Sequence, residues 1–511
     1  MTSYRTRVLL AIGVAALGAA IWYAISFVPL PGYPRSTYAR MGKFGPVVSW
    51  PLTPIHAVTL PDGRVLTFGT DANGRQGGVL IYDVWDPSKG LGPASHLTLP
   101  NATGTNIFCA GTLVLPDAKG TVLLAGGDRT VRGQRNWSSP AVTFFDPGSN
   151  TLRDYGKPMR RPRWYPTLLT LPDGDVLIAG GRVSPTLFTG DVEVYHPDGS
   201  WGVLEKATSD AAFGTQDWNY PRMWLRPDEQ VLVMSITGDL FNMNMKDDGR
   251  ISRLDIPASK LGVGHPYLPS VMYRPGHILA MRTHFTYKDV DLTGPQPVIR
   301  PVAHRYFARQ NSNLTLMADG SVLLNGGGLR DNSQHWFVMA NRLTEIWNPD
   351  TGEWHFGPIA NKTRLYHSTT MLLPDGTVFT GGGGAPGPVQ NLNAEIYYPP
   401  YLFKKGDSGE FAPRPAIVQA PAVVTRGQVI TVDVQAKGIG SVTLLHSGAV
   451  THTLGFEQSF HKLAWQQVAP GQLRVTLPAA RHELPPGYYY LFVFDTDGVP
   501  SVSKIIRVMI G

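Results

Sequence analysis

One phrase decides the fold, and its clearest copy is Pro166-TLLTLPDGDVLIAGG-Arg182. Apolar residues on each side of the Pro-Asp-Gly sequence predict two strands. Because Pro, Asp and Gly favour the backbone angles of a tight turn, the two strands are expected to form a hairpin. The phrase occurs seven times at intervals of 43 to 56 residues, with its turn at Pro61, Pro116, Pro172, Pro227, Pro275, Ala318 and Pro374. That interval matches a four-stranded blade, so the sequence predicts a seven-bladed β-propeller.

A second strand pair completes several of these units. It leads into a proline, as in Tyr82-DVWDP, Val142-TFFDP, Val192-EVYHP, Thr344-EIWNP and Ala394-EIYYP. Glycine pairs such as Gly180-Gly181 follow the second strand of the phrase and resemble the kelch signature, where glycine permits left-handed backbone. We therefore expect a kelch-like propeller over residues 35–400.

The repeat stops near residue 400. Residues 401–414 contain several strand breakers and predict a linker. Short strands such as Tyr488-YYLFVF and Lys504-IIRVMI predict an immunoglobulin-like β-sandwich over residues 415–511. The expected fold class is all-β.

Residues 1–34 differ from the rest of the chain. Residues 8–30 carry no charged side chain, follow Arg5 and Arg7, and are long enough to cross a bilayer. We predict a short cytoplasmic stub and an uncleaved transmembrane signal anchor, with the remaining chain outside the cytoplasm. A cleaved signal peptide, which would give a secreted protein, and a buried core helix are the alternatives.

The composition excludes several classes of protein. Hydrophobic residues make up 42% and charged residues 16%, which is too apolar for a disordered chain. The net charge of +7 comes without a Lys/Arg cluster, so we expect no nucleic-acid partner. The single cysteine, Cys109, excludes an intramolecular disulfide and a multi-cysteine zinc site.

Equivalent positions of the innermost strands converge on the channel of a propeller. Seven residues before each turn stand Pro54, Cys109, Tyr165, Tyr220, Leu268, Asn311 and His367. A thiol, a phenol and an imidazole thus share one register in blades two, three and seven, and Tyr366 directly precedes His367. Each residue alone fits a packed core, and we interpret Tyr220 as structural. Their joint placement predicts a site at one mouth of the channel.

Five separated segments resemble the glyoxal oxidase and galactose oxidase family of copper radical oxidases. They are Asn106-IFCAGT, Arg163-WYPTLLTLPDG, Arg364-LYHSTTMLLPDG, Gly448-AVTHTLGFEQ and Pro485-PGYYYLFVFDTDGVPS. The resemblance covers about residues 50–511. It implies a thioether between Cys109 and Tyr165 that carries a stable radical. It also implies one copper ion bound by Tyr165, Tyr366, His367 and His452, the last on a hairpin that the C-terminal domain sends into the channel.

The implied donor set suits copper(II) with one open position. The resemblance implies oxidation of small, glyoxal-like aldehydes or primary alcohols, with Tyr366 as general base, the Tyr165 radical as hydrogen acceptor, and reduction of O2 to hydrogen peroxide. Galactose oxidases stack a tryptophan on the modified tyrosine from the loop that here contains Val183. This difference favours the glyoxal oxidase side. Trp137 and Trp336 are candidates to stack instead.

For other polar residues, an ordinary structural or surface role competes with a functional one. Arg129, Arg182 and Arg330 follow second strands and are candidate contacts for an oxygen-rich or anionic substrate, although solvated surface positions are the default. Four histidines lie outside the register and are interpreted as structural or surface residues: His265, His284, His304 and His335. The competing function is a non-catalytic kelch-type propeller that binds an extracellular polysaccharide or a protein partner. An oxidase that remodels an extracellular polymer lies between the two.

Overall fold

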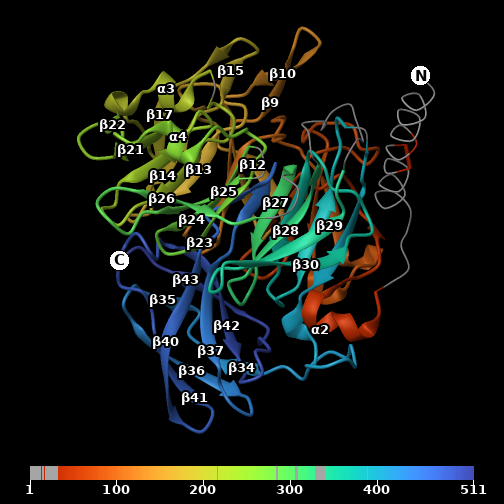
Figure 1. Ribbon diagram of the computed structural model, residues 1–511. Helices are drawn as coiled ribbons and strands as arrows, with labels where there is room; N and C mark the ends of the chain where they lie inside the picture. The colour runs from red at the N-terminus through yellow and green to blue at the C-terminus, as the bar shows by residue number, and fades with distance from the viewer. Residues whose placement is uncertain are drawn as a thin grey trace, which may run out of the picture.

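The computed structural model describes residues 33–511 except 216, 284–285, 305–308, 329–339 and 388, and also residues 13, 16 and 17. In this part of the chain the architecture is all-β, and the only α-helical elements with assigned bounds are α2 (Tyr38–Met41), α3 (Asp210–Phe213) and α4 (Ala258–Leu261). Figure 1 shows a propeller with the C-terminal domain below it. The prediction of seven blades followed by a sandwich-like C-terminal sheet is confirmed.

Blades two to six each contain four antiparallel strands. Blades two and three consist of β7 (Gly111–Val114), β8 (Val122–Ala125), β11 (Val142–Asp146) and β12 (Thr151–Asp154), and of β13 (Thr167–Thr170), β14 (Val176–Ala179), β17 (Val192–Tyr195) and β18 (Trp201–Val203). Blades four and five consist of β19 (Arg222–Leu225), β20 (Val231–Met234), β21 (Leu240–Asn244) and β22 (Arg250–Arg253), and of β23 (Ser270–Arg274), β24 (His277–Arg282), β25 (Thr286–Asp291) and β26 (Val298–Val302). Blade six consists of β27 (Gln310–Leu316), β28 (Val322–Gly328), β29 (Leu343–Asn348) and β30 (Glu353–Ile359).

The first and last blades close the ring. Blade one consists of β3 (His56–Thr59), β4 (Val65–Phe68), β5 (Ile81–Trp85) and β6 (His96–Pro100). Blade seven consists of β31 (Ser368–Leu372), β32 (Val378–Gly382) and β33 (Asn393–Tyr398), and its outer edge pairs with β1 (Lys43–Phe44) and β2 (Val48–Ser49). Strands from the two ends of the propeller therefore share one sheet, which covers an edge that would otherwise stay unpaired.

The C-terminal domain is a folded sheet of eight strands. These are β34 (Ala416–Gln419), β35 (Val423–Val424), β36 (Val429–Gln435), β37 (Ser441–His446), β40 (Phe460–Ala469), β41 (Gln472–Thr476), β42 (Gly487–Phe494) and β43 (Lys504–Val508). The long strand β40 pairs with β37 through its first half and with β41 through its second half. The two halves enclose a core that includes Val432, Leu444 and Leu491. The eight strands therefore form two layers that pack face to face, as in a β-sandwich.

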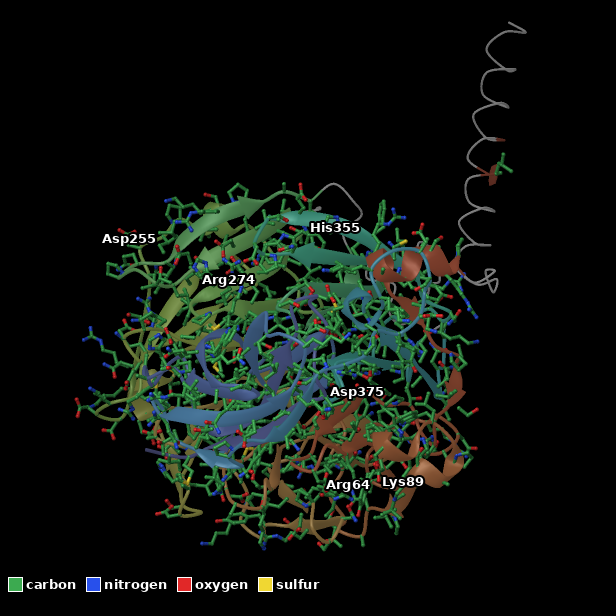
Figure 2. The ribbon with its side chains drawn as sticks, turned by 90° about the horizontal axis from the view of Figure 1, so that it is seen from below. Arg64, Lys89, Asp255, Arg274, His355 and Asp375 are labelled. Carbon is green, nitrogen blue, oxygen red and sulfur yellow. The ribbon has the colours of Figure 1, made fainter. Side chains whose placement is uncertain are left out.

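The turns of the repeated phrase meet the C-terminal domain. Tyr488 Oη donates to the carbonyl of Asp117 at 2.6 Å, and Thr443 Oγ1 donates to the carbonyl of Ala318 at 2.9 Å. Figure 2, viewed from below, shows this domain lying across the ring of blades. The starts of the inner strands, where the sequence places the site, consequently lie toward the opposite end of the propeller.

The predicted anchor over residues 8–30 lies outside the described residues, apart from residues 13, 16 and 17. Among the residues that are described, no helix has both the length and the apolar character needed to cross a membrane.

Candidate metal centre

Residues seven positions before the turns of the repeated phrase have an unusual backbone conformation. The φ angle is 58° at Cys109, 66° at Tyr165, 44° at Tyr220, 59° at Asn311 and 66° at His367. Non-glycine residues rarely adopt positive φ, and such residues concentrate at turns and functional sites. The Tyr165 N–H donates to the Cys109 carbonyl at 3.1 Å, and the Tyr220 N–H donates to the Tyr165 carbonyl at 2.9 Å. Blades two, three and four are therefore hydrogen-bonded to one another at this register.

The structure brings the five predicted site residues together. The hydroxyl oxygens of Tyr165 and Tyr366 lie 2.7 Å apart. Cys109 Sγ lies 3.5 Å from His452 Nε2, and the rings of His367 and His452 are 4.4 Å apart between centroids. All five side chains are buried. One thiol, two phenols and two imidazoles thus converge from three blades and the C-terminal domain.

A hairpin of the C-terminal domain carries His452 into the channel. Its strands β38 (Ala449–Thr451) and β39 (Leu454–Phe456) extend the sheet of blade one, because β38 pairs with β3. Glu457 Oε1 accepts the Thr170 N–H of blade three at 2.6 Å, and Gln458 Oε1 accepts the Leu316 N–H of blade six at 3.0 Å. Three blades therefore fix the hairpin that positions His452.

Glu457 makes the stability of this docking depend on pH. Burial raises the pKa of its carboxyl from 4.5 to about 7. Between these values the folded chain keeps a proton that the unfolded chain has released, so the free energy of unfolding falls as pH rises, by up to about 3 kcal/mol. We expect a Glu457→Gln variant to lack this contribution. Thermal unfolding of both proteins at pH 5 and pH 8 measures the difference.

The expected result is that the wild-type protein loses more stability than Glu457→Gln between these two pH values. Other titrating groups are common to both proteins and cancel in the comparison. Identical changes in melting temperature would show that Glu457 does not titrate in this interval.

The two predicted histidine ligands present unprotonated nitrogens. His367 Nδ1 donates to the Gly384 carbonyl at 2.7 Å, which leaves its Nε2 as a buried acceptor that has no hydrogen-bond partner among the described residues. The Thr451 hydroxyl donates to the Ile55 carbonyl, so it accepts from His452 Nδ1 and leaves His452 Nε2 unprotonated. Burial lowers the pKa of His367 to about 3 and that of His452 well below its usual value. Both imidazoles are therefore neutral and able to bind a metal ion.

The remaining donors point to the same conclusion. Burial raises the pKa values of Cys109, Tyr165 and Tyr366 well above their usual ranges. Without a nearby cation these groups keep their protons, because a phenolate in an apolar site is unfavourable. A bound cation would supply the missing charge and the partner that His367 Nε2 lacks. Two imidazoles with two phenol oxygens are a donor set that suits copper(II).

Sequence reasoning missed a third imidazole beside Cys109. His56 Nε2 accepts the Cys109 N–H at 3.1 Å, and its ring stacks on Phe68. Ligand atoms of His56, Cys109 and His452 lie within 4.8 Å of one another. Because its Nε2 accepts the Cys109 N–H, His56 orients Cys109; its Nδ1 then carries the ring proton and has no hydrogen-bond partner among the described residues. Its position two residues after Pro54, at the start of the first repeat, was the available signal.

Two tryptophans contact Tyr165. Its ring centroid lies 4.4 Å from Trp164 and 5.7 Å from Trp218, and Arg182 stacks on Trp164 at 4.1 Å. Trp137 makes no ring contact with Tyr165 among the described residues, and Trp336 lies outside them. The predicted stacking candidates therefore gain no support. Both tryptophans precede the first strand of a blade, whereas the predicted candidates follow a second strand in the sequence.

The other sequence candidates occupy different settings. Tyr220, interpreted as structural, packs edge-on against Tyr165 with centroids 4.8 Å apart. His304 Nε2 lies 3.0 Å from Glu345 Oε2, and the ring of His265 contacts Tyr267, which in turn packs against Tyr366. Arg330, His284 and His335 fall outside the described residues.

Comparisons with known proteins agree with this geometry. Residues 414–508 match the family model described as galactose oxidase-like, Early set domain. Galactose oxidase from Gibberella zeae is 28% identical in an alignment that covers 92% of this chain and 71% of that protein. Aldehyde oxidase GLOX from Vitis pseudoreticulata is 25% identical, with 93% and 95% covered. The chain is a homologue of galactose oxidase and glyoxal oxidase. The resemblance predicted from the five segments is confirmed.

A solved structure shares the fold of this galactose oxidase homologue. It is a fungal alcohol oxidase of the AA5 family, in complex with copper, with a TM-score of 0.78 and 21% sequence identity. The alignment covers 92% of this chain and 100% of the fungal chain.

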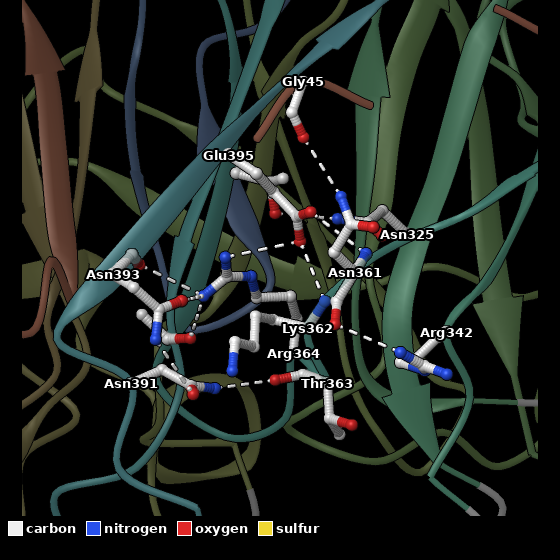
Figure 3. A network of polar contacts seen from close by, with 12 residues as sticks. Gly45, Asn325, Arg342, Asn361, Lys362, Thr363, Arg364, Asn391, Asn393 and Glu395 are labelled. Atoms are coloured by element: carbon white, nitrogen blue, oxygen red, sulfur yellow. Dashed lines mark hydrogen bonds and ion pairs between the residues drawn. The ribbon is translucent and has the colours of Figure 1, made fainter. Parts of the chain in front are cut away.

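Buried arginine–glutamate pairs fix the segments that carry the site, as Figure 3 shows for blade seven. Arg364, two residues before Tyr366, lies 3.4 Å from Glu395 and donates to the Gly382 carbonyl at 3.0 Å. Arg163 and Glu193 repeat the arrangement before Tyr165, at 3.0 Å. Each glutamate comes from the third strand of its blade, within the Glu-Ile-Tyr and Glu-Val-Tyr motifs. These motifs were visible in the sequence, but their pairing was not.

Proposed function

We propose that the protein is a copper radical oxidase that oxidises small, glyoxal-like aldehydes or primary alcohols and releases hydrogen peroxide. The observation that carries this proposal is the convergence of Cys109, Tyr165, Tyr366, His367 and His452 at one buried point. Homology to galactose oxidase and to an aldehyde oxidase supports the reaction class. In this proposal Tyr165, Tyr366, His367 and His452 hold one copper ion.

Cys109 and Tyr165 form the proposed thioether. The two residues lie on adjacent blades and are joined through the Tyr165 N–H and the Cys109 carbonyl. Bond formation between Sγ and the ring carbon beside the hydroxyl removes two hydrogens, which O2 accepts. The sulfur donates electron density to the ring, so the crosslinked phenol is easier to oxidise.

Tyr366 and Tyr165 divide the work on the substrate. Bound copper would supply a one-electron redox partner for Tyr165 and a position for the substrate oxygen. Tyr366 accepts the hydroxyl proton of the alcohol, or of the hydrated aldehyde, at its Oη atom. In its oxidised, radical form Tyr165 accepts a hydrogen atom from the adjacent carbon at its own Oη, which lies 2.7 Å from Tyr366 Oη, and bound copper would take up the remaining electron. O2 then takes up two electrons and two protons and leaves as hydrogen peroxide.

Copper reconstitution with a peroxide-coupled screen tests the function. We expect one copper per chain, the optical absorption of a tyrosyl radical, and peroxide from glyoxal, methylglyoxal or glycolaldehyde. Val183 at the place of a stacking tryptophan supports aldehydes over galactose. A preference for galactose would overturn the substrate class. Failure to bind stoichiometric copper and to release peroxide would favour the non-catalytic, partner-binding propeller.

We also propose that the propeller works outside the cytoplasm, anchored by residues 8–30. The support is a 23-residue stretch without charged side chains that follows two arginines. Protease added to intact cells should digest the propeller. Protection from the protease would contradict the location, and a mature protein that begins after this stretch would identify cleavage and secretion.

A further inference from the structure

A hairpin on blade two carries three exposed arginines. Strands β9 (Asp128–Val131) and β10 (Gln134–Ser138) extend away from the propeller at the end opposite the C-terminal domain, as Figure 1 shows. Arg129, Arg132 and Arg135 are all exposed. In the sequence the three residues do not form a basic cluster, because uncharged residues separate them. The hairpin gathers them on one projecting element.

Among the described residues these arginines form no ion pair, although burial raises the pKa of the Asp128 carboxyl and Arg135 is near enough to lower it in part. Nearby arginines do form ion pairs: Arg75 pairs with Asp71 at 3.6 Å, and Arg161 pairs with Asp191 at 2.9 Å. The carboxylate within the hairpin, Asp128, is buried, and its Oδ1 accepts the N–H groups of Arg129 and Asn136. Arg135 donates to the Gln76 carbonyl at 2.9 Å, but all three guanidinium groups are exposed and keep N–H groups that can bind an external anion.

The hairpin is attached beside the candidate centre. Asp128 forms an antiparallel backbone bridge with Asn106, three residues before Cys109. Ser139 forms another with Arg163, two residues before Tyr165. Arg182 donates to the Asn136 carbonyl of the hairpin at 2.7 Å and stacks on Trp164. A row of cations thus runs from the hairpin to the aromatic side chains beside Tyr165. We call this row the arginine rim, formed by Arg129, Arg132, Arg135 and Arg182.

The spacing of the rim fits a polymer better than a small anion. Guanidinium groups bind carboxylates through paired hydrogen bonds. Arg129 lies on β9, Arg132 in the turn that follows it and Arg135 on β10, whereas Arg182 contacts Asn136 lower on the hairpin, so the cations are spread along the hairpin and do not surround one point. Repeated carboxylates along a chain can bind the successive arginines, and each contact raises the effective concentration of the next.

We propose that the arginine rim binds an acidic polysaccharide and places its sugar units at the mouth of the centre. The inference rests on the proposed function, because sugars with a free primary alcohol between carboxylate-bearing units would then be oxidised at the centre.

Nucleic acid fits the arginine rim less well than an acidic polysaccharide. Surfaces that bind single strands combine cations with several aromatic rings for successive bases, whereas Trp137 is the one aromatic residue of the hairpin, and it is half-buried.

Fluorescence anisotropy with labelled hyaluronan and the full chain tests the rim. The test variant is Arg129→Gln/Arg132→Gln/Arg135→Gln. The control is Lys462→Gln/Arg474→Gln/Lys504→Gln, which removes three exposed cations from the C-terminal domain. We expect the test variant to bind about tenfold more weakly and the control to bind like the wild type. Added salt should weaken wild-type binding, because the groups are exposed.

Four outcomes would overturn the assignment. They are unchanged binding by the test variant, an equal loss in the control, equally tight binding of a neutral galactomannan, and tighter binding of single-stranded DNA than of hyaluronan. Unaltered melting temperatures check that both variants fold. Binding is measured without turnover. A protein that binds hyaluronan but releases no peroxide would therefore refute the proposed function without contradicting the assignment of the arginine rim as a binding surface.

Discussion

A Cys109→Ser protein is expected to release peroxide at least about a thousandfold more slowly than the wild type, which corresponds to about 4 kcal/mol in the barrier. Serine preserves the size of the side chain but cannot form the thioether with Tyr165. The unmodified phenol is harder to oxidise, and its burial opposes ionisation. The proposed copper donors remain in place, so copper content should not change. Peroxide-coupled turnover with glyoxal and metal analysis of the same sample measure both quantities.

Tyr220→Phe is the matched control for this experiment. Tyr220 occupies the same register position in the next blade and packs against Tyr165, but it is not one of the proposed donors. We expect this variant to keep most of its activity. The intact mass of copper-loaded wild-type protein should be lower by two hydrogens, and that of Cys109→Ser should not. Full activity in Cys109→Ser, or no mass loss in the wild type, would contradict the proposed cofactor.

Arg364→Ala is expected to lower the free energy of unfolding by about 3–5 kcal/mol. Both Arg364 and Glu395 are fully buried, so removing the guanidinium leaves an uncompensated carboxylate in the interior. The same change frees the segment just before Tyr366, and copper affinity should fall with stability. Thermal unfolding and a competitive copper titration measure the two effects.

An exposed pair provides the control for this prediction. Arg160 pairs with Glu205 at the surface, where solvent screens the charges, so Arg160→Ala should lower the melting temperature far less than Arg364→Ala. Replacing both buried partners, as in Arg364→Leu/Glu395→Leu, should restore part of the lost stability, because no charge is then left unpaired. Equal melting temperatures for Arg364→Ala and Arg160→Ala would show that the buried pair does not anchor the segment.

The seven blades were predictable from the sequence because their signals are local. A Pro-Asp-Gly turn between apolar runs specifies a hairpin regardless of its surroundings. Repetition of the phrase then sets the number of blades. The same repetition placed Cys109, Tyr165 and His367 at the same level along the propeller axis, because they occupy the same position in successive copies of the repeat. The structure adds that this position has left-handed backbone, which no side-chain pattern reveals.

The sequence by itself thus determined the blades, the register of the inner strands and, through resemblance, the set of donors. Only the tertiary structure decided which side chains meet. His56 reaches Cys109, Trp218 reaches Tyr165, and His452 enters the channel because a hairpin pairs with blade one. These contacts join residues of different blades or domains. They depend on how those units dock and on side-chain direction, and the periodicity of a strand encodes neither.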